Sequence, residues 1–293
     1  MKKPIFKGSA VAIITPFTDK GVDFDKLAEL CEFQIKNQTD AIVVCGTTGE
    51  ASTMPDHEHL AAIRCVVEAV GKRIPVIAGT GSNDTSHAVE LSQKAAALGA
   101  DGLLSVTPYY NKTSQHGLYL HFKAVAEATD LPVILYNVPS RTNLNINPET
   151  IAQLALLPTI NGIKECKIEQ AGEVANLCGE NLNIYSGEDG LVLPILSFGG
   201  LGVISVMGNI IPALTHQMVA AFLNGDVAAA TRLQVYLTPL VKTLFCDVNP
   251  IPVKTAMNMM GMNVGSFRLP LCETSAANQA LIRKTLTEYS LLL

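Results

Sequence analysis

Lys164 is the residue whose type and position most directly suggest chemistry. It follows Gly162-Ile163 at the end of an apolar run, where a hydrated ammonium group is out of place. Burial lowers the pKa of a lysine and leaves a neutral amine that can attack a ketone, so we predict a Schiff base between Lys164 and a keto substrate. Two other interpretations stay open from position alone: an amine that extends into water, or one paired with Glu165.

Hydroxyl groups at the ends of other apolar runs could move protons for such an amine. Tyr136 ends one run and Thr47 follows another. Forming and dehydrating a carbinolamine needs repeated proton transfers in a site that excludes water, and Tyr136, Thr47 and a second tyrosine could relay them. A single buried tyrosine more often only satisfies a hydrogen bond, but three such groups at one place favour the relay.

Two loop features could bind carboxylates. Arg141 lies in a loop opened by Pro139-Ser140, where its planar guanidinium could hold a carboxylate through two hydrogen bonds. An arginine exposed on a surface loop is the alternative. The turn Gly46-Thr47-Thr48-Gly49 has no lysine and is therefore no Walker-type loop. Its backbone N–H groups suit an anion such as the carboxylate of a keto acid.

The order of apolar runs predicts the scaffold that positions these residues. Eight short runs alternate with segments of helical periodicity, one of which follows the expected N-cap Asp23. This alternation implies parallel strands with right-handed crossovers, and eight such units close a (β/α)8 TIM barrel of the α/β class. Its active site would lie at the C-terminal ends of the strands. The predicted strands span residues 10–14, 41–45, 75–78, 102–106, 132–136, 161–164, 182–186 and 202–206.

A doubly wound sheet is the alternative fold. It would need a glycine-rich phosphate turn after the first strand, where this sequence reads Ile14-Thr15-Pro16-Phe17-Thr18, so the barrel is preferred. After residue 225 the pattern becomes entirely helical. We therefore expect a catalytic barrel over residues 1–225 and a C-terminal helical appendage over residues 226–293.

Composition excludes several other classes of protein. With 21 Lys+Arg against 26 Asp+Glu, the net charge of −5 argues against a nucleic-acid partner. Residues 191–225 contain no Asp, Glu, Lys or Arg, but Pro194, Pro212 and several glycines interrupt them, so we expect a helix end, a strand and a helix rather than a membrane span. The seven scattered cysteines and six histidines show no metal-ligand spacing. No apolar stretch follows the basic start before Asp19, so we expect no secretory signal. We expect no metal and a cytoplasmic location.

The chain contains four motifs, each at the end of a predicted strand: Gly46-Thr47-Thr48-Gly49-Glu50, Pro108-Tyr109-Tyr110-Asn111-Lys112, Tyr136-Asn137-Val138-Pro139-Ser140-Arg141-Thr142 and Gly162-Ile163-Lys164-Glu165. With these motifs the sequence resembles the dihydrodipicolinate synthase family. That family belongs to the pyruvate-dependent class I aldolase superfamily, which also contains N-acetylneuraminate lyase. The resemblance covers essentially the whole chain.

The resemblance implies a set of catalytic roles. Lys164 would form the imine with pyruvate, and Tyr136 would relay protons. Thr47 and Tyr110 would complete the relay, with Tyr110 reaching in from a neighbouring subunit. The implied assembly is a homotetramer built from two tight dimers.

The resemblance also implies the substrates. Arg141 would hold the carboxylate of L-aspartate 4-semialdehyde, while Thr48 and the backbone of Gly187 and Ile204 would line the pyruvate pocket. The implied reaction condenses the two substrates to 4-hydroxy-tetrahydrodipicolinate, in diaminopimelate and lysine biosynthesis, without a cofactor. A sialic-acid or keto-sugar-acid lyase generally lacks the arginine, and a non-catalytic keto-acid sensor would not need the relay.

The chain departs from the family pattern in two places. Cys166-Lys167-Ile168-Glu169 replaces a small residue, Thr or Ser, Gly and Asp or Asn, which affects the sixth loop. Of the residues that bind L-lysine in feedback-inhibited members, His59, Asn83 and Tyr109 are present as a possible effector site. Ala51, Asp56 and His87 differ from the inhibited members, and the loss of a carboxylate at position 87 predicts weak or absent inhibition by lysine.

Overall fold

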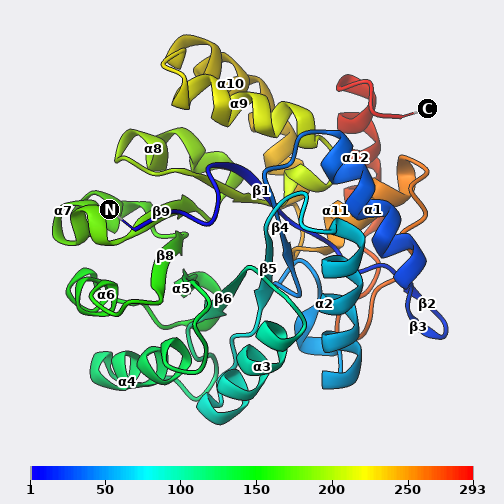
Figure 1. Ribbon diagram of the computed structural model, residues 1–293. Helices are drawn as coiled ribbons and strands as arrows, with labels where there is room; N and C mark the ends of the chain where they lie inside the picture. The colour runs from blue at the N-terminus through cyan, green and yellow to red at the C-terminus, as the bar shows by residue number, and fades with distance from the viewer. Residues whose placement is uncertain (1, 293) are drawn as a thin grey trace.

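Eight parallel strands close into a barrel in the computed structural model, which describes residues 2–292 (Figure 1). The strands neighbour one another in the order β1-β10-β9-β8-β7-β6-β5-β4, with helices between successive strands. This arrangement confirms the predicted (β/α)8 barrel. The strands are β1 (Gly8–Ala12), β4 (Ala41–Val44), β5 (Val76–Gly79), β6 (Gly102–Val106), β7 (Val133–Asn137), β8 (Ile160–Glu165), β9 (Asn183–Ser186) and β10 (Gly202–Ser205).

The first barrel strand lies two residues earlier than the sequence predicted. The backbone N–H of Ile13 still donates to the carbonyl of Val43 at 3.0 Å. The N–H of Ile14 instead donates to the side-chain Oδ1 of Asn209 at 3.1 Å, so the chain leaves the strand ladder there. The prediction of residues 10–14 was therefore wrong at both ends, because apolar burial continues past the last regular strand pairing. Each of the other seven predicted strands differs from the structure by at most one residue at an end.

Helices form the layer outside the barrel, and short polar side chains begin several of them. The predicted N-cap Asp23 accepts a hydrogen bond from the backbone N–H of Lys26 at 3.0 Å, and Ser114 caps its helix in the same way. The α-helices of this layer are α1 (Phe24–Lys36), α2 (Asp56–Val70), α3 (Thr85–Ala97), α4 (Gln115–Ala126), α6 (Pro148–Ala155), α7 (Ala171–Cys178), α8 (Val192–Ser197) and α9 (Pro212–Leu223), whereas the short α5 (Pro139–Thr142) follows β7 at the mouth of the barrel. Short 3₁₀ helices and one small antiparallel pair complete the barrel region: η1 (Ala51–Thr53), η2 (Ile168–Gln170), η3 (Gly179–Asn181), η4 (Asp189–Leu191), η5 (Met207–Asn209), β2 (Phe17–Thr18) and β3 (Gly21–Val22).

Side chains alternate along the strands between the barrel interior and the helical layer. On β7, Ile134 and Tyr136 belong to the interior cluster, whereas Leu135 belongs to the larger cluster beneath the helices. Both faces of a strand are therefore apolar, which explains why the runs in the sequence are nearly continuous. Tyr185 is completely buried in the interior, where its ring stacks on Phe6 with 4.4 Å between ring centroids.

The C-terminal part of the chain is helical, as predicted. It contains α10 (Val227–Leu244), α11 (Ile251–Met259) and α12 (Ala276–Glu288). Helix α10 contacts α9 of the barrel layer, and the two lie side by side in Figure 1. The division of the chain into two regions at residue 225 stays a prediction.

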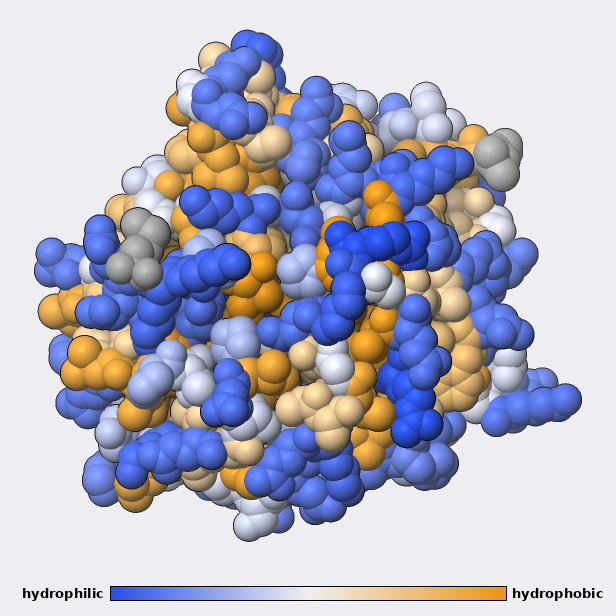
Figure 2. Space-filling view, in the orientation of Figure 1, coloured by the Kyte–Doolittle hydropathy of each residue, from blue (hydrophilic) through white to orange (hydrophobic). Residues whose placement is uncertain are grey.

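The uncharged stretch 191–225 forms α8, β10 and α9, which agrees with the expected helix, strand and helix. Among residues 2–292, no helix combines the length and apolar character needed to cross a membrane. Hydrophilic side chains predominate on the face of the molecule shown in Figure 2, and hydrophobic ones appear between them.

Candidate active site

Lys164 lies next to Tyr136 at the C-terminal ends of adjacent strands, the mouth of the barrel. The two residues are paired in the register of β7 and β8, and Lys164 Nζ lies 4.4 Å from the centroid of the Tyr136 ring. Only 5% of Lys164 is exposed, and burial lowers the pKa of its amine. The position of Lys164 favours a neutral amine over one that extends into water.

Glu165 does not neutralise the amine, because its carboxylate is occupied elsewhere. Its Oε1 accepts hydrogen bonds from Asn137 Nδ2 and the backbone N–H of Lys167, both at 2.8 Å. Its Oε2 accepts one from Gln170 Nε2 at 2.9 Å. Side chains of successive strand residues point to opposite faces, so Glu165 faces away from the interior that Lys164 enters. Glu165 thus binds the loop that follows it, through the backbone of Lys167 and the side chain of Gln170.

Tyr136 is enclosed in the barrel interior and interacts with the hydroxyl of Thr47. Burial raises the pKa of the Tyr136 phenol, and the hydrogen bond with Thr47 acts in the opposite direction. The phenol is therefore protonated at neutral pH and has a proton to donate. The structure brings Lys164, Tyr136 and Thr47 to one place.

Thr47 and Thr48 are carried by a tight turn that the C-terminal helices support. The N–H of Gly49 donates to the carbonyl of Gly46 at 3.1 Å, and Glu50 follows in a left-handed conformation with φ of 54°. Thr48 is buried, and its Oγ1 accepts a hydrogen bond from Asn249 Nδ2 at 3.0 Å. Asn249 thus links the region before α11 to the turn.

A second link to this turn is an ion pair that the sequence reasoning missed. Lys254 Nζ, on α11, lies 2.6 Å from Glu50 Oε1, and neither side chain is exposed. The same ammonium also donates to the carbonyls of Thr15 (3.1 Å) and Ser266 (2.7 Å). A lysine within an otherwise apolar helix segment was the available signal, but nothing in the sequence indicated its partner.

Arg141 lies on the short helix α5 at the rim of the site. It is exposed, and one guanidinium nitrogen, Nη2, donates to the carbonyl of Asn249 at 3.2 Å. A cavity of about 560 Å³ opens here, with Thr47, Tyr136 and Arg141 on its wall. The guanidinium is placed to meet an anion that enters this cavity.

Gly187 directly follows β9, and Ile204 lies on β10. A Cβ atom on Gly187 would lie 2.3 Å from Cys166 Sγ and 3.2 Å from Lys164 Cγ, so the position accepts only glycine unless Cys166 moves. Ile204 is buried in the interior cluster that also contains Tyr136. The backbone at Gly187 therefore lies against the side chain of Lys164.

Tyr110 is the one expected catalytic residue that its own chain does not bring to the site. Its side chain is 92% exposed and its φ is 69°. A large aromatic side chain exposed to this degree packs against little of its own chain. The role expected from the resemblance therefore depends on a second subunit.

Of the three possible effector residues, two line this cavity and the third, Asn83, contacts one of them. His59 is buried and its Nε2 donates to the carbonyl of Gly79 at 2.8 Å, while burial lowers its pKa. Asn83 Nδ2 donates to the backbone carbonyl of Tyr109 at 3.2 Å. His59 and Tyr109 line the cavity that also contains Tyr136 and Arg141.

The altered positions near these residues contact one another. His87 Nε2 donates to the two carboxylate oxygens of Asp56 at 3.1 and 3.2 Å, and His87 Nδ1 lies 3.2 Å from Ser82 Oγ. Ala51 lies on η1, on the wall of the same cavity. Asp56 is therefore already paired and is not a free carboxylate.

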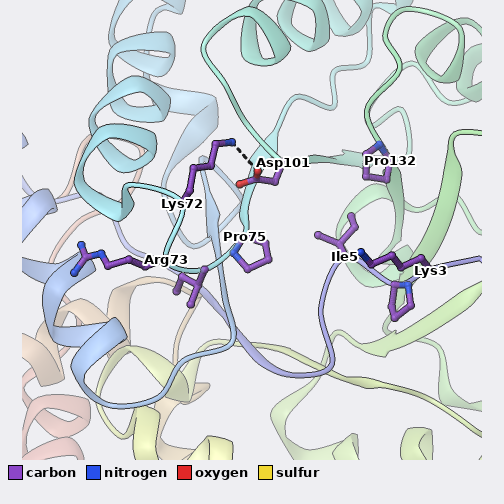
Figure 3. Close-up of a pocket in the computed structure, with 9 residues that line it drawn as sticks. Lys3, Ile5, Lys72, Arg73, Pro75, Asp101 and Pro132 are labelled. Carbon is purple, nitrogen blue, oxygen red and sulfur yellow. Dashed lines mark hydrogen bonds and ion pairs between the residues drawn. The ribbon is translucent and has the colours of Figure 1, made fainter.

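A second hollow of about 360 Å³ lies at the opposite end of the barrel, where the strands begin (Figure 3). Its rim carries Lys72, which pairs with Asp101 at 2.7 Å, and Arg73, which points away towards Glu32. This end of a TIM barrel serves stability rather than catalysis. Within residues 2–292, no cluster of three or more His, Cys, Asp or Glu is arranged to hold a metal ion.

Curated relatives that match this barrel along its full length show that it is an enzyme of the lyase class. One relative, 4-hydroxy-tetrahydrodipicolinate synthase of Acetivibrio thermocellus, is 59% identical over 292 residues, which cover 100% of both chains. The chain belongs to the dihydrodipicolinate synthetase family, whose model matches residues 5–289.

Solved structures agree with this assignment. Dihydrodipicolinate synthase from Cyanidioschyzon merolae with lysine bound superimposes with a TM-score of 0.96 at 39% identity, covering 99% of this chain and 100% of the other. The chloride-inhibited enzyme from Acinetobacter baumannii complexed with pyruvate gives a TM-score of 0.95 at 41% identity, covering 98% and 99%. Membership of this family assigns the enzyme to the biosynthesis of diaminopimelate and lysine.

Proposed function

We propose that this enzyme condenses pyruvate with L-aspartate 4-semialdehyde through a Schiff base on Lys164, giving 4-hydroxy-tetrahydrodipicolinate. The observation that carries the proposal is the burial of the Lys164 amine against the ring of Tyr136, 4.4 Å from its centroid. The name of the Acetivibrio relative and the pyruvate in the Acinetobacter structure support the choice of substrates.

The proposed chemistry begins with attack of the neutral Lys164 amine on the C2 carbonyl of pyruvate. The carbinolamine loses water to give the imine, and removal of a C3 proton then gives an enamine. The enamine carbon attacks the aldehyde and forms the new C–C bond. Finally the substrate's own amine attacks C2, closes the ring and releases Lys164. The lysine itself activates the ketone, so the proposal includes no cofactor.

Protons in these steps pass through the hydroxyl groups of Tyr136 and Thr47. The phenol of Tyr136 is buried and protonated, so it can protonate the departing hydroxyl of the carbinolamine and be restored through Thr47. In the same proposal, Arg141 holds the carboxylate of the aldehyde substrate. Thr48 and the backbone of Gly187 and Ile204 surround pyruvate.

Tyr110 completes the relay from a second subunit in this proposal, within a tetramer of two tight dimers. Its full exposure on the monomer is the supporting observation. Two inactive variants, Lys164→Ala and Tyr110→Phe, provide the test when they are mixed after reversible dissociation. A shared site restores one intact centre in each mixed dimer, so activity recovers; no recovery in proven mixed dimers would count against Tyr110.

We also propose a cytoplasmic location and an effector site at His59, Asn83 and Tyr109. The seven cysteines are all free thiols, which suits a reducing compartment. The effector proposal is supported by the lysine bound in the structure from Cyanidioschyzon. The cavity that joins His59 and Tyr109 to Tyr136 would couple the two sites.

Borohydride reduction in the presence of pyruvate tests the central proposal. We expect a single pyruvate adduct in intact-mass spectrometry, mapped to Lys164, and no adduct in Lys164→Ala. Loss of this covalent step should lower kcat by several orders of magnitude. Lys167→Ala is the matched control, because this lysine lies on the following loop. An adduct on Lys167 or Lys254 would refute the assignment.

A further inference from the structure

Asn249 contacts two residues of the proposed substrate sites, although it belongs to the C-terminal region, which supplies none of the binding or catalytic residues proposed above. Only 7% of Asn249 is exposed. Its side-chain Nδ2 donates to Thr48 Oγ1 at 3.0 Å, and its backbone carbonyl accepts a hydrogen bond from Arg141 Nη2 at 3.2 Å. Asn249 therefore joins a residue proposed to bind pyruvate to the one proposed to hold the aldehyde substrate.

The other polar atom of this amide does nothing for the fold. Asn249 Oδ1 is buried and has no hydrogen-bond partner within residues 2–292. A buried acceptor without a partner costs free energy that an apolar side chain of similar shape would avoid. The reason for an amide at this position therefore lies in its Nδ2 donor, and so in its bond to Thr48.

The Nδ2 donor and Thr48 are held against each other by two further contacts. Lys254, on the helix that begins just after Asn249, pairs with Glu50 at 2.6 Å, in the turn that carries Thr48. The bond from Arg141 fixes the backbone of Asn249 on its other side. The amide therefore has little freedom to turn away from the threonine.

This contact determines where the hydroxyl group of Thr48 can point its hydrogen. A threonine hydroxyl has one hydrogen and two acceptor lone pairs. Since Asn249 Nδ2 donates to Thr48 Oγ1, the hydroxyl hydrogen must point away from Asn249. Within residues 2–292, the Thr48 hydroxyl donates to no other side chain or backbone carbonyl. Its hydrogen is thus available to a ligand, and an ionised carboxylate is purely an acceptor.

Thr48 is also close to the proposed imine chemistry. The neighbouring Thr47 interacts with the hydroxyl of Tyr136, whose ring centroid lies 4.4 Å from Lys164 Nζ. Thr47, Tyr136 and Arg141 lie on the wall of one cavity. A keto acid bound to Lys164 would therefore have its carboxylate near this turn.

We propose that Asn249 is a positioning residue for pyruvate: within the function proposed above, its amide makes Thr48 a fixed hydrogen-bond donor to the pyruvate carboxylate. Asn249 acts through Thr48 and touches neither substrate. Because the donor direction is set before pyruvate arrives, binding does not have to reorient the hydroxyl group.

Asn249→Asp and Asn249→Leu test the proposal. The aspartate variant keeps the shape but accepts the hydroxyl hydrogen of Thr48, which turns that hydrogen away from pyruvate. The leucine variant removes the donor without adding charge. We measure the pyruvate concentration for half-maximal borohydride trapping on Lys164. It should rise about ten- to a hundredfold in Asn249→Asp and about three- to tenfold in Asn249→Leu. The kcat at saturating pyruvate should change less than about threefold.

Thr48→Val provides the second half of a double-mutant cycle, because valine has the shape of threonine without the hydroxyl group. In this background the hydroxyl through which Asn249 acts is gone. Each Asn249 substitution should then change the half-maximal concentration less than about twofold.

Asn258→Leu is the matched control on the same helix. The amide of Asn258 donates to the carbonyl of Gly265 at 2.9 Å and accepts from the N–H of Val264 at 2.8 Å. Its replacement should lower the urea midpoint of unfolding and leave pyruvate trapping unchanged. Asn249→Leu should show the reverse pattern, with a midpoint close to that of the parent.

Each other outcome overturns the proposal. Equal losses with and without the Thr48 hydroxyl would arise from the added charge or from altered packing. Failure of both Asn249 variants to fold would give the residue a structural role instead. Unchanged trapping in Thr48→Val would show that this hydroxyl does not bind pyruvate. If the parent itself traps no pyruvate on Lys164, the proposed function fails as well.

Discussion

Lys254 and Glu50 form an ion pair at 2.6 Å in which both side chains are completely buried, and the pair joins α11 to the turn that carries Thr47 and Thr48. The two residues are 204 positions apart in the chain. The C-terminal helices therefore help to position the hydroxyl groups of the candidate site, although they contribute no residue to the proposed imine chemistry.

Lys254→Met should destabilise the protein and disturb the turn. Removing one partner of a buried ion pair leaves an uncompensated charge and costs about 3–5 kcal/mol. We expect this loss in the free energy of unfolding measured with urea. The double variant Glu50→Gln/Lys254→Met should recover part of it, because no charge is left unpaired. A single variant as stable as the parent would contradict the assignment.

Glu165 should make stability depend on pH. Burial raises its pKa to about 7, whereas an unfolded glutamate titrates near about 4.3. Between these values the folded protein binds more protons than the unfolded chain, so this contribution to stability falls as the pH rises. Relative to Glu165→Gln, the parent should lose about 3 kcal/mol of unfolding free energy between pH 5 and pH 8.

Urea unfolding of both proteins at several pH values measures this difference. Glu169→Gln serves as the control, because Glu169 is exposed and its removal should leave the pH profile of the parent unchanged. A difference between the parent and Glu165→Gln that stays constant from pH 5 to pH 8 would show that Glu165 is ionised throughout.

Arg141→Ala should weaken the aldehyde substrate more than pyruvate. Its guanidinium makes one hydrogen bond to the carbonyl of Asn249, at 3.2 Å, and lies on the cavity wall. A charge-assisted bidentate pair contributes about 1.5–3 kcal/mol, so KM for L-aspartate 4-semialdehyde should rise roughly ten- to a hundredfold. Initial rates with each substrate varied in turn measure both constants. Arg141→Lys is the control that keeps the positive charge but cannot donate two parallel hydrogen bonds to a carboxylate. If Arg141→Ala weakens both substrates equally, the carboxylate role is refuted.

L-Lysine should inhibit weakly or not at all. Position 87 lacks the carboxylate of inhibited members, and Asp56, the possible replacement, is already bonded to His87 at 3.1 Å. Loss of one charge-assisted bond corresponds to about ten- to a hundredfold in affinity. A lysine titration of the initial rate at pyruvate near its KM measures the effect. His87→Glu should increase the sensitivity of the enzyme to lysine. Strong inhibition of the parent at about 0.1 mM lysine would contradict the prediction.

The sequence by itself determined the barrel and the strand ends at which its polar residues gather. Strands covered on both faces require continuous apolar runs, and these runs are local enough to be read residue by residue. Lys164 stands out for the same reason, because its charge interrupts such a run. The boundary of the first strand was missed because Ile13 and Ile14 remain buried after regular pairing has ended.

Only the tertiary structure decided which groups meet. Burial of the Lys164 amine, the contact of Lys254 with Glu50 and the bonding of Asp56 to His87 all depend on residues from separate elements. Periodicity reports which face of one element is apolar, whereas these contacts arise when the barrel closes and brings distant loops together.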